Sequence, residues 1–412
     1  MTATRKFTLK LFFGWLAGLF LAVLAFSQAA APVGLAIDTF RPMGAGFFSW
    51  RSGQIRLAMS VFDPTKKVSG PQLTRSGQAT LLLAPLTPRS LWLVGKGQEI
   101  QGELPKARKA MQQAERISRH DGAVQLWLGT DNISRGAITK GLRNFDLMIR
   151  ADLEASAVVM PRLAMIIAAP EGRRYLAPFI NEGNPWLLDL LHVAARDLPR
   201  AAPLAQLLVD RKQSAPDIPY VRAVYATLTQ RLIQERSYSL ALRLYPLLPG
   251  ANSASLHNVS GVSDGKLEEG YPPFIWHFPD SDAQGASFVG VDRGQTGIES
   301  FGAPGTVGVA ASKLVAPRGQ THFRWRVEER VANVQSSATW EVTCLTGAAA
   351  GTVLKSANLL DKAIPTGRSI AMQIPGNCEL LRIDMRIAGG IGRSPASVVM
   401  SSFELAGKTA GR

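Results

Sequence analysis

Cysteine and histidine are scarce in this 412-residue chain, which has two cysteines and five histidines. No two histidines have the i, i+4 spacing of helical metal ligands; they are His120, His192, His257, His277 and His322. Neither cysteine has a neighbouring cysteine or histidine, so zinc-finger and zinc-ribbon sites are excluded. The sequence therefore predicts no metal site and no cofactor.

Motifs for catalysis are also missing. There is no Gly-x-Ser-x-Gly elbow, no His-Glu-x-x-His pair and no Gly-x-x-x-x-Gly-Lys phosphate loop. Glycosidases need two carboxylates across a cleft, and the acidic candidates are expected to be solvated in loops or at strand ends: Glu268, Glu269, Asp280, Asp282, Glu328 and Glu329. We therefore expect no catalytic residues. An enzyme acting on cell-wall or exopolysaccharide glycans remains the alternative.

Long runs of basic residues are absent, although the chain carries 46 Lys and Arg against 31 Asp and Glu, a net charge of +15. Most of this surplus precedes residue 251, and the remainder of the chain is nearly neutral. A basic surface favours anionic partners in general. Without a recognisable nucleic-acid motif, we predict no nucleic-acid binding.

One long uncharged segment runs from Leu11 to Ile37, behind Arg5, Lys6 and Lys10. Such a segment is long enough to cross a bilayer as a helix, and the preceding positive charge places the N-terminus in the cytoplasm. A cleaved signal peptide is the alternative, because the segment 27–29 resembles a cleavage site. Both hypotheses export the rest of the chain. We expect an inner-membrane protein with one span and its bulk in the periplasm.

The hydrophobic period changes near residue 251. Before it, apolar residues recur every three to four positions, as in helices; after it, short segments alternate with period two, as in strands. The expected fold is therefore multidomain, with a helical solenoid followed by a jelly-roll-like β-sandwich. The expected parts are an anchor (1–37), a connector (38–72), helices (73–250), a linker (251–271) and the sandwich (272–412), whose ten expected strands begin with 273–278.

A weak repeat of 34 residues relates 90–117 to 124–151. The aligned pairs are Gly95 with Gly129, Gly102 with Gly136, Leu104 with Ile138, Ala107 with Gly141, and Met111 with Phe145. Small residues would let neighbouring helices approach, and the large apolar residue would fill the groove beside them. This period resembles the tetratricopeptide repeat, although the closing proline is missing. Arrays of this kind bind protein partners, so we expect one here.

The two cysteines, Cys344 and Cys378, both fall in the β part. In an exported protein an isolated pair predicts a disulfide. Two buried free thiols are the alternative.

Aromatic residues in the β part share their faces with apolar companions. Phe323 and Trp325 alternate with His322, Arg324 and Arg326 along one expected strand. The aromatic side chains are therefore expected to be buried rather than to form a sugar platform. The polar face holds the candidate glycan contacts, His322, Arg324 and Arg326, although a solvated sheet face explains the same pattern.

Short motifs give a resemblance over most of the chain: Pro-Phe-x-Trp at 273–276, Trp-x-x-x-Cys at 340–344 and Pro-Gly-x-Cys at 375–378. With this order of parts, the chain resembles a set of proteobacterial envelope proteins. They have a membrane anchor, degenerate tetratricopeptide-like helices and a C-terminal sandwich like a carbohydrate-binding module. From the anchor, the repeat-like helices and the module-like sandwich we expect a non-enzymatic, membrane-tethered periplasmic scaffold or binding protein. Its helices would bind a protein partner and its sandwich a glycan or a second protein, in export or assembly of surface polysaccharide.

Overall fold

The computed structural model describes residues 68–83, 85–152, 156–263, 266–279, 281–291 and 295–407. The expected anchor, Leu11–Ile37, lies outside these ranges. Within them, no helix is both long and apolar enough to cross a membrane. The contacts divide the chain into two compact units, Met1–Ala155 and Ser156–Arg412. The second unit thus holds the later helices together with the sandwich, while the predicted domain boundaries stay predictions.

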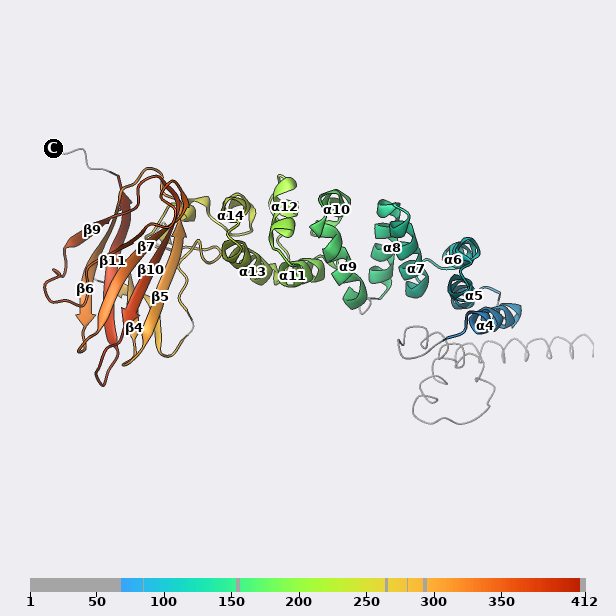
Figure 1. Cartoon of the computed structure of the whole chain (residues 1–412), viewed down its shortest axis with the longest axis horizontal. Helices are drawn as coiled ribbons and strands as arrows, with labels where there is room; N and C mark the ends of the chain where they lie inside the picture. Colours follow the sequence, from blue (N-terminus) through green and yellow to red (C-terminus); the bar gives the residue numbers. More distant parts are fainter. Residues whose placement is uncertain are drawn as a thin grey trace, which may run out of the picture. The chain divides into compact units, whose positions relative to one another are not determined.

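Paired antiparallel helices form the described part of the first unit (Figure 1). They are α4 (Gly70–Leu83), α5 (Pro88–Ile100), α6 (Leu104–Ile117), α7 (Gly122–Ser134) and α8 (Ile138–Ala151). The α5–α6 hairpin and the α7–α8 hairpin begin 34 residues apart, at Pro88 and Gly122. The 34-residue period is therefore a real structural repeat. Membership of the tetratricopeptide family stays a prediction.

Glycines allow the two helices of each hairpin to approach. A Cβ added at Gly95 would lie 2.9 Å from Met111 Cε, and one at Gly129 would lie 2.4 Å from Phe145 Cε1. The two contacts join residues that the repeat aligns. The expected packing of a large apolar side chain against a glycine is therefore present in both hairpins.

The second unit begins with six more helices. They are α9 (Ser156–Ala168), α10 (Pro170–Leu176), α11 (Leu187–Asp197), α12 (Ala202–Asp210), α13 (Val221–Gln234) and α14 (Tyr238–Leu244). The apolar stripe of α11 is fully buried, including Leu187, Leu190 and Leu191. α13 begins 34 residues after α11, so the repeat length recurs here although the sequence does not display it clearly.

Two antiparallel sheets pack face to face in the C-terminal part (Figure 1). The five-stranded sheet has the order β3-β4-β11-β6-β9 and the four-stranded sheet the order β5-β10-β7-β8. The strands are β3 (Gln284–Val291), β4 (Gln295–Gly302), β5 (Val307–Val315), β6 (His322–Val331), β7 (Ser337–Gly347), β8 (Val353–Lys355), β9 (Ser369–Gln373), β10 (Cys378–Ala388) and β11 (Ala396–Ala406). The expected antiparallel sandwich is confirmed, and the finer jelly-roll assignment stays a prediction.

The first expected strand, 273–278, is wrong. This segment is a turn that touches the four-stranded sheet through one bridge, between His277 and Ser312. Its aromatic residues are nevertheless buried as expected, since Phe274 is 0% and Trp276 5% exposed. The alternation of the sequence therefore predicted which side chains are buried. It did not predict the backbone structure, because a single bridge does not make the segment a strand.

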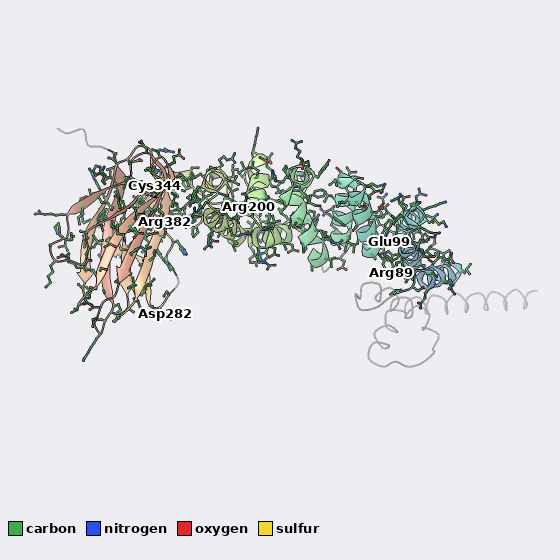
Figure 2. The ribbon with its side chains drawn as sticks, viewed as in Figure 1. Arg89, Glu99, Arg200, Asp282, Cys344 and Arg382 are labelled. Atoms are coloured by element: carbon green, nitrogen blue, oxygen red, sulfur yellow. A yellow bond between two sulfur atoms is a disulfide. The ribbon has the colours of Figure 1, made fainter. Side chains whose placement is uncertain are left out.

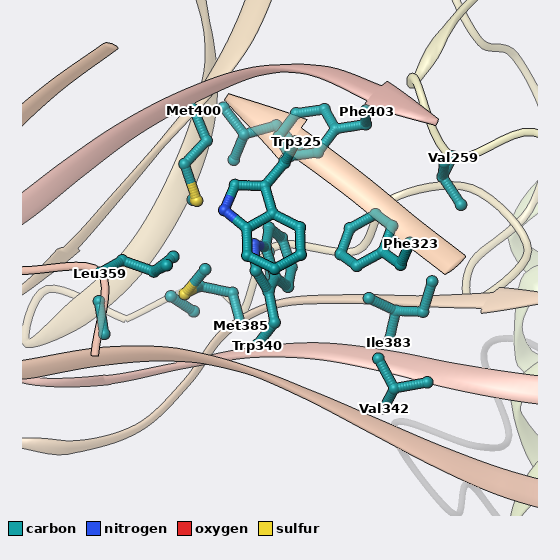
Figure 3. Packing of buried hydrophobic residues seen from close by; sticks show 14 of the residues in the cluster. Val259, Phe323, Trp325, Trp340, Val342, Leu359, Ile383, Met385, Met400 and Phe403 are labelled. Carbon is teal, nitrogen blue, oxygen red and sulfur yellow. The ribbon is translucent and has the colours of Figure 1, made fainter. Parts of the chain in front are cut away.

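Aromatic rings fill the space between the sheets (Figure 3). Trp340 from β7 meets Phe323 from β6 edge-on, with ring centroids 5.2 Å apart, and lies 6.3 Å from Trp325. All three side chains are at most 1% exposed. This confirms that these rings belong to the core and are not available to a ligand.

The last helices are joined to the sandwich by a cluster of aromatic rings. Tyr271 lies edge-on to Tyr225 and Tyr245, and Tyr245 lies 4.8 Å from Phe274. Tyr225 donates a hydrogen bond to the Pro216 carbonyl at 2.9 Å. Burial raises the pKa of Tyr245 to about 12 and raises the pKa of Tyr271 as well. The helix–sandwich junction is therefore a packed interior.

A two-stranded hairpin, β1 (Val262–Ser263) with β2 (Lys266–Leu267), lies in the expected linker. Directly after it, Glu268 forms a 2.5 Å ion pair with Lys313 of β5 and accepts a 2.8 Å hydrogen bond from Asn258. The Lys313 side chain is 0% and the Glu268 side chain 3% exposed. The expectation that Glu268 is a solvated carboxylate is wrong, because the hairpin folds this side chain into the junction.

Candidate ligand-binding site

A cleft of about 640 Å³ lies between the turn that joins α13 to α14 and the outer face of the four-stranded sheet. The helical side contributes Ile233, Gln234, Arg236 and Tyr238, and the sandwich side contributes Thr343, Cys344, Leu345, Ala350, Gly351 and Arg382. The size is that of a typical small-ligand pocket. Two guanidinium groups, a phenol and a carboxamide can form hydrogen bonds there.

The sandwich side of the cleft is set by strand register. Arg382 of β10 pairs with Thr343 of β7, so both side chains leave the same outer face of the sheet. The disulfide between Cys344 and Cys378 confirms the predicted cysteine pair and joins the same two strands. Figure 2 shows Cys344 and Arg382 on the sandwich. The floor of the cleft is thus crosslinked as well as hydrogen-bonded.

The helical side is held by two charged residues at the end of α13. Arg231 donates hydrogen bonds to the carbonyl oxygens of Ala195 and Leu198, at 2.6 and 2.8 Å. Glu235 accepts the Ala201 N–H at 2.8 Å and pairs with Arg231 at 3.0 Å. These contacts fix the start of the turn that carries Arg236 and Tyr238 against the preceding helices, so this wall of the cleft is preorganised.

Positive charge dominates the cleft, because no carboxylate is among its lining residues. Arg382 lies 2.9 Å from Asp384, whose other oxygen accepts a 2.6 Å hydrogen bond from Ser312. The Arg382 side chain is still 43% exposed. The Thr343 hydroxyl has no solvent exposure and no hydrogen-bond partner, which is costly for a buried polar atom.

Two carboxylates lie next to each other on the same sheet face. Asp384 pairs across strands with Glu341. Glu341 is held by Lys355 at 3.1 Å and Arg386 at 3.0 Å, while Asp384 is held by Arg382. Each carboxylate therefore has a cationic partner, the usual arrangement of a structural charge network.

The predicted glycan contacts lie on the other sheet. His322, Arg324 and Arg326 leave the outer face of β6, in the five-stranded sheet, and all three are partly exposed. Arg324 lies 4.0 Å from Glu404, and Arg326 lies 4.0 Å from Glu328. They share a face as predicted, but none of them lines the cleft. Their role in glycan binding stays a prediction.

Of the residues that line the cleft, only Cys344 was singled out by the sequence, as a disulfide cysteine; the polar lining residues, Arg236 and Arg382 included, were not predicted. Arg236 lies two residues after the end of α13, the position that Gly102 and Gly136 hold after α5 and α7. The 34-residue period counted on from Gly136 reaches Tyr238 instead, so the repeat does not mark Arg236. No signal marks Arg382 either, because its approach to the helices depends on how the sandwich folds back onto them.

A second hollow, of about 460 Å³, lies between α10 and α12. Three arginines line it, Arg173, Arg174 and Arg211, but so do Glu171 and Asp210. Because this hollow has both acidic and basic lining residues, its charge does not indicate one class of ligand, as the lining of the cleft does.

Groups of three or more histidine, cysteine or acidic side chains able to hold a metal ion do not occur among the described residues. Asp280, one of the acidic candidates, falls outside them. The prediction that the chain uses no metal therefore stays a prediction.

Comparisons with known proteins give distant similarities in structure. The module TmCBM61, solved in complex with β-1,4-galactotriose, is 10% identical with a TM-score of 0.21, and the match covers 31% of this chain and 85% of that one. The enzymatically active domain of tailspike protein 4 of bacteriophage CBA120 is 13% identical with a TM-score of 0.20, over 35% of this chain and 21% of that chain. No protein-family model and no curated protein matches the chain.

Proposed function

We propose that this chain is a non-enzymatic binding protein that holds a saccharide in the cleft between α13–α14 and the four-stranded sheet. The observation that carries the proposal is the lining of the cleft. Its guanidinium, phenol and carboxamide groups match the many hydroxyls of a sugar, and Tyr238 supplies an aromatic surface.

The place of action in this proposal is an extracytoplasmic compartment. The Cys344–Cys378 disulfide indicates an oxidising location. The proposal adds tethering to the inner membrane by the segment Leu11–Ile37, and binding of a protein partner by the helical repeats. A role in export or assembly of a surface polysaccharide follows from combining these parts.

A binding role fits the charge arrangement better than catalysis does. A glycosidase needs one carboxylic acid that stays protonated near neutral pH. The adjacent carboxylates Glu341 and Asp384 are instead each bound in ion pairs with Lys355, Arg386 or Arg382, as in a structural charge network. The enzyme alternative predicts release of new reducing ends when the chain is incubated with a bound polysaccharide, and loss of that release in Glu341→Gln.

Saccharide binding by the full-length chain tests the proposal. We expect an array of bacterial and plant oligosaccharides to contain members that bind the chain, and Tyr238→Ala to weaken that binding by about tenfold or more. Tyr220→Ala is the matched control, since Tyr220 is 86% exposed and does not line the cleft. Absence of binding to every saccharide, or equal effects of the two substitutions, would refute the proposal.

A further inference from the structure

Arg236 occupies a left-handed backbone position after a helix, which two other helix ends of the chain give to glycine and one gives to Lys212. At four helix ends the residue after the C-cap donates its N–H to the carbonyl three positions back: Lys212 to Val209 at 3.1 Å and, with a second bond that follows, Gly102 to Glu99 at 2.9 Å, Gly136 to Ile133 at 2.9 Å and Arg236 to Ile233 at 3.0 Å. The next N–H then reaches five positions back, from Glu103 to Gln98, from Ala137 to Asn132 and from Ser237 to Leu232. All three are Schellman turns.

The left-handed backbone of these turns disfavours any side chain. The φ angles are 80° at Gly102, 78° at Gly136 and 57° at Arg236. An L-residue there brings its Cβ close to the carbonyl oxygen, whereas glycine avoids the contact. The first two turns therefore use the residue that the conformation favours. The third keeps an arginine against this preference, and strain of this kind often marks a functional position.

The side chain of Arg236 lines the cleft together with that of Arg382. Arg236 is exposed, and no carboxylate pairs with it in the part of the chain that the structure describes. Two guanidinium groups around one hollow with no acidic lining favour an anion that accepts hydrogen bonds from a planar fork, namely a carboxylate, sulfate or phosphate.

We infer that Arg236 and Arg382 bind an oxyanion carried by the saccharide, so that the cleft selects acidic over neutral glycans. This inference rests on the proposed function and adds the substrate class. It assigns a role in specificity to Arg236, at a backbone position that α5 and α7 give to glycine. Gln234 and Tyr238 remain available to the neutral part of the ligand.

The test compares the full-length chain with Arg236→Gly on an array that pairs neutral oligosaccharides with matched uronate-, sulfate- and phosphate-bearing ones. We expect acidic members alone to bind, and R236G to weaken their binding by at least about tenfold. Because glycine relieves the backbone strain, the melting temperature of R236G should equal that of the unmodified chain or exceed it by up to about 2–4 °C. The three acidic classes on the array tell which oxyanion is bound.

Lys212→Gly is the matched control. Lys212 also follows a helix, has φ 53° and carries a positive charge, but it does not line the cleft. K212G should relieve similar strain and leave saccharide binding unchanged. Arg236→Asn provides a second variant, because asparagine tolerates this backbone conformation, and it should lose binding as R236G does.

The outcomes separate the inference from the proposed function. Equal binding of neutral and acidic members, with R236G unchanged, would overturn the inference and leave saccharide binding standing. Absence of binding to every member would overturn both. A lower melting temperature in R236G than in the unmodified chain would contradict the strain argument, and equal loss of binding in K212G would show that net charge rather than Arg236 is responsible.

Discussion

Replacing Glu268 with glutamine leaves the Lys313 ammonium buried without a negative partner. The two side chains are 3% and 0% exposed and their charged atoms are 2.5 Å apart. Removing one member of a buried pair typically costs about 3–5 kcal/mol, because the remaining charge stays desolvated. The glutamine keeps the shape and can still bond to Asn258, so we expect about 3 kcal/mol for E268Q. A unit of this size should then melt about 6–12 °C lower.

A double-mutant cycle separates the pair from its surroundings. Lys313→Met should also destabilise, because it leaves Glu268 charged and buried. The double variant E268Q/K313M buries no charge and conserves volume, so its unfolding free energy should lie within about 1 kcal/mol of the unmodified chain. Chemical denaturation measures all four proteins. Glu269→Gln is the control, since the neighbouring Glu269 side chain is 78% exposed, and it should change stability by less than about 0.5 kcal/mol.

The pH dependence gives a second check on the same pair. Burial lowers the pKa of Lys313, and the nearby Glu268 carboxylate partly opposes that shift. In E268Q this opposition is lost, so the pKa of Lys313 should fall further. A lysine whose pKa is lowered in the folded state reduces the free energy of unfolding. The whole reduction is present at pH values below the lowered pKa, and it disappears as the pH rises toward 10.5, the ordinary lysine pKa. The deficit of E268Q should therefore shrink between neutral pH and pH 10.5. A deficit that grows with pH, or single variants as stable as the unmodified chain, would refute this account.

Three further predictions concern other parts of the chain. Replacing Cys344 and Cys378 with serine opens a loop of about 35 residues, and we expect a loss of about 4 kcal/mol in chemical denaturation; an unchanged midpoint would contradict a structural role for the crosslink. Gly129→Ala places a methyl group 2.4 Å from Phe145 and should cost about 1–3 kcal/mol despite the better helix propensity of alanine; a gain in stability would show that the ring can move aside. Burial raises the pKa of Tyr245 to about 12, so its contribution to stability is complete below pH 10 and is lost as the pH rises toward 12. Y245F should show a shallower alkaline loss of stability, and identical pH profiles would contradict this.

The order of the parts could be predicted from periodicity. Residues with a period near 3.6 became helices, and nine of the ten expected strands were found within a few residues of their expected bounds among the described ranges. Alternation also assigned Phe323, Trp325 and Trp340 to the core. These features follow from local sequence, because burying one face of a helix or strand imposes its own period.

The cleft could not be predicted in the same way, because its two sides are more than a hundred residues apart in the chain. Arg236 and Arg382 line one cleft because the helices and the sandwich meet at the junction of Tyr225, Tyr245 and Tyr271. Glu268 shows the same limit: its hydrophilic neighbours predict solvation, and only the hairpin before it brings the side chain to Lys313.

The sequence by itself determined the two kinds of architecture, the cysteine pair and the absence of familiar catalytic motifs, because these depend on period, spacing and composition. Tertiary structure alone decided where the helices meet the sandwich, which charges are buried there and which arginines share a cleft. Those properties depend on contacts between distant segments, and hydrophobic patterning sets which face is buried without naming its partner.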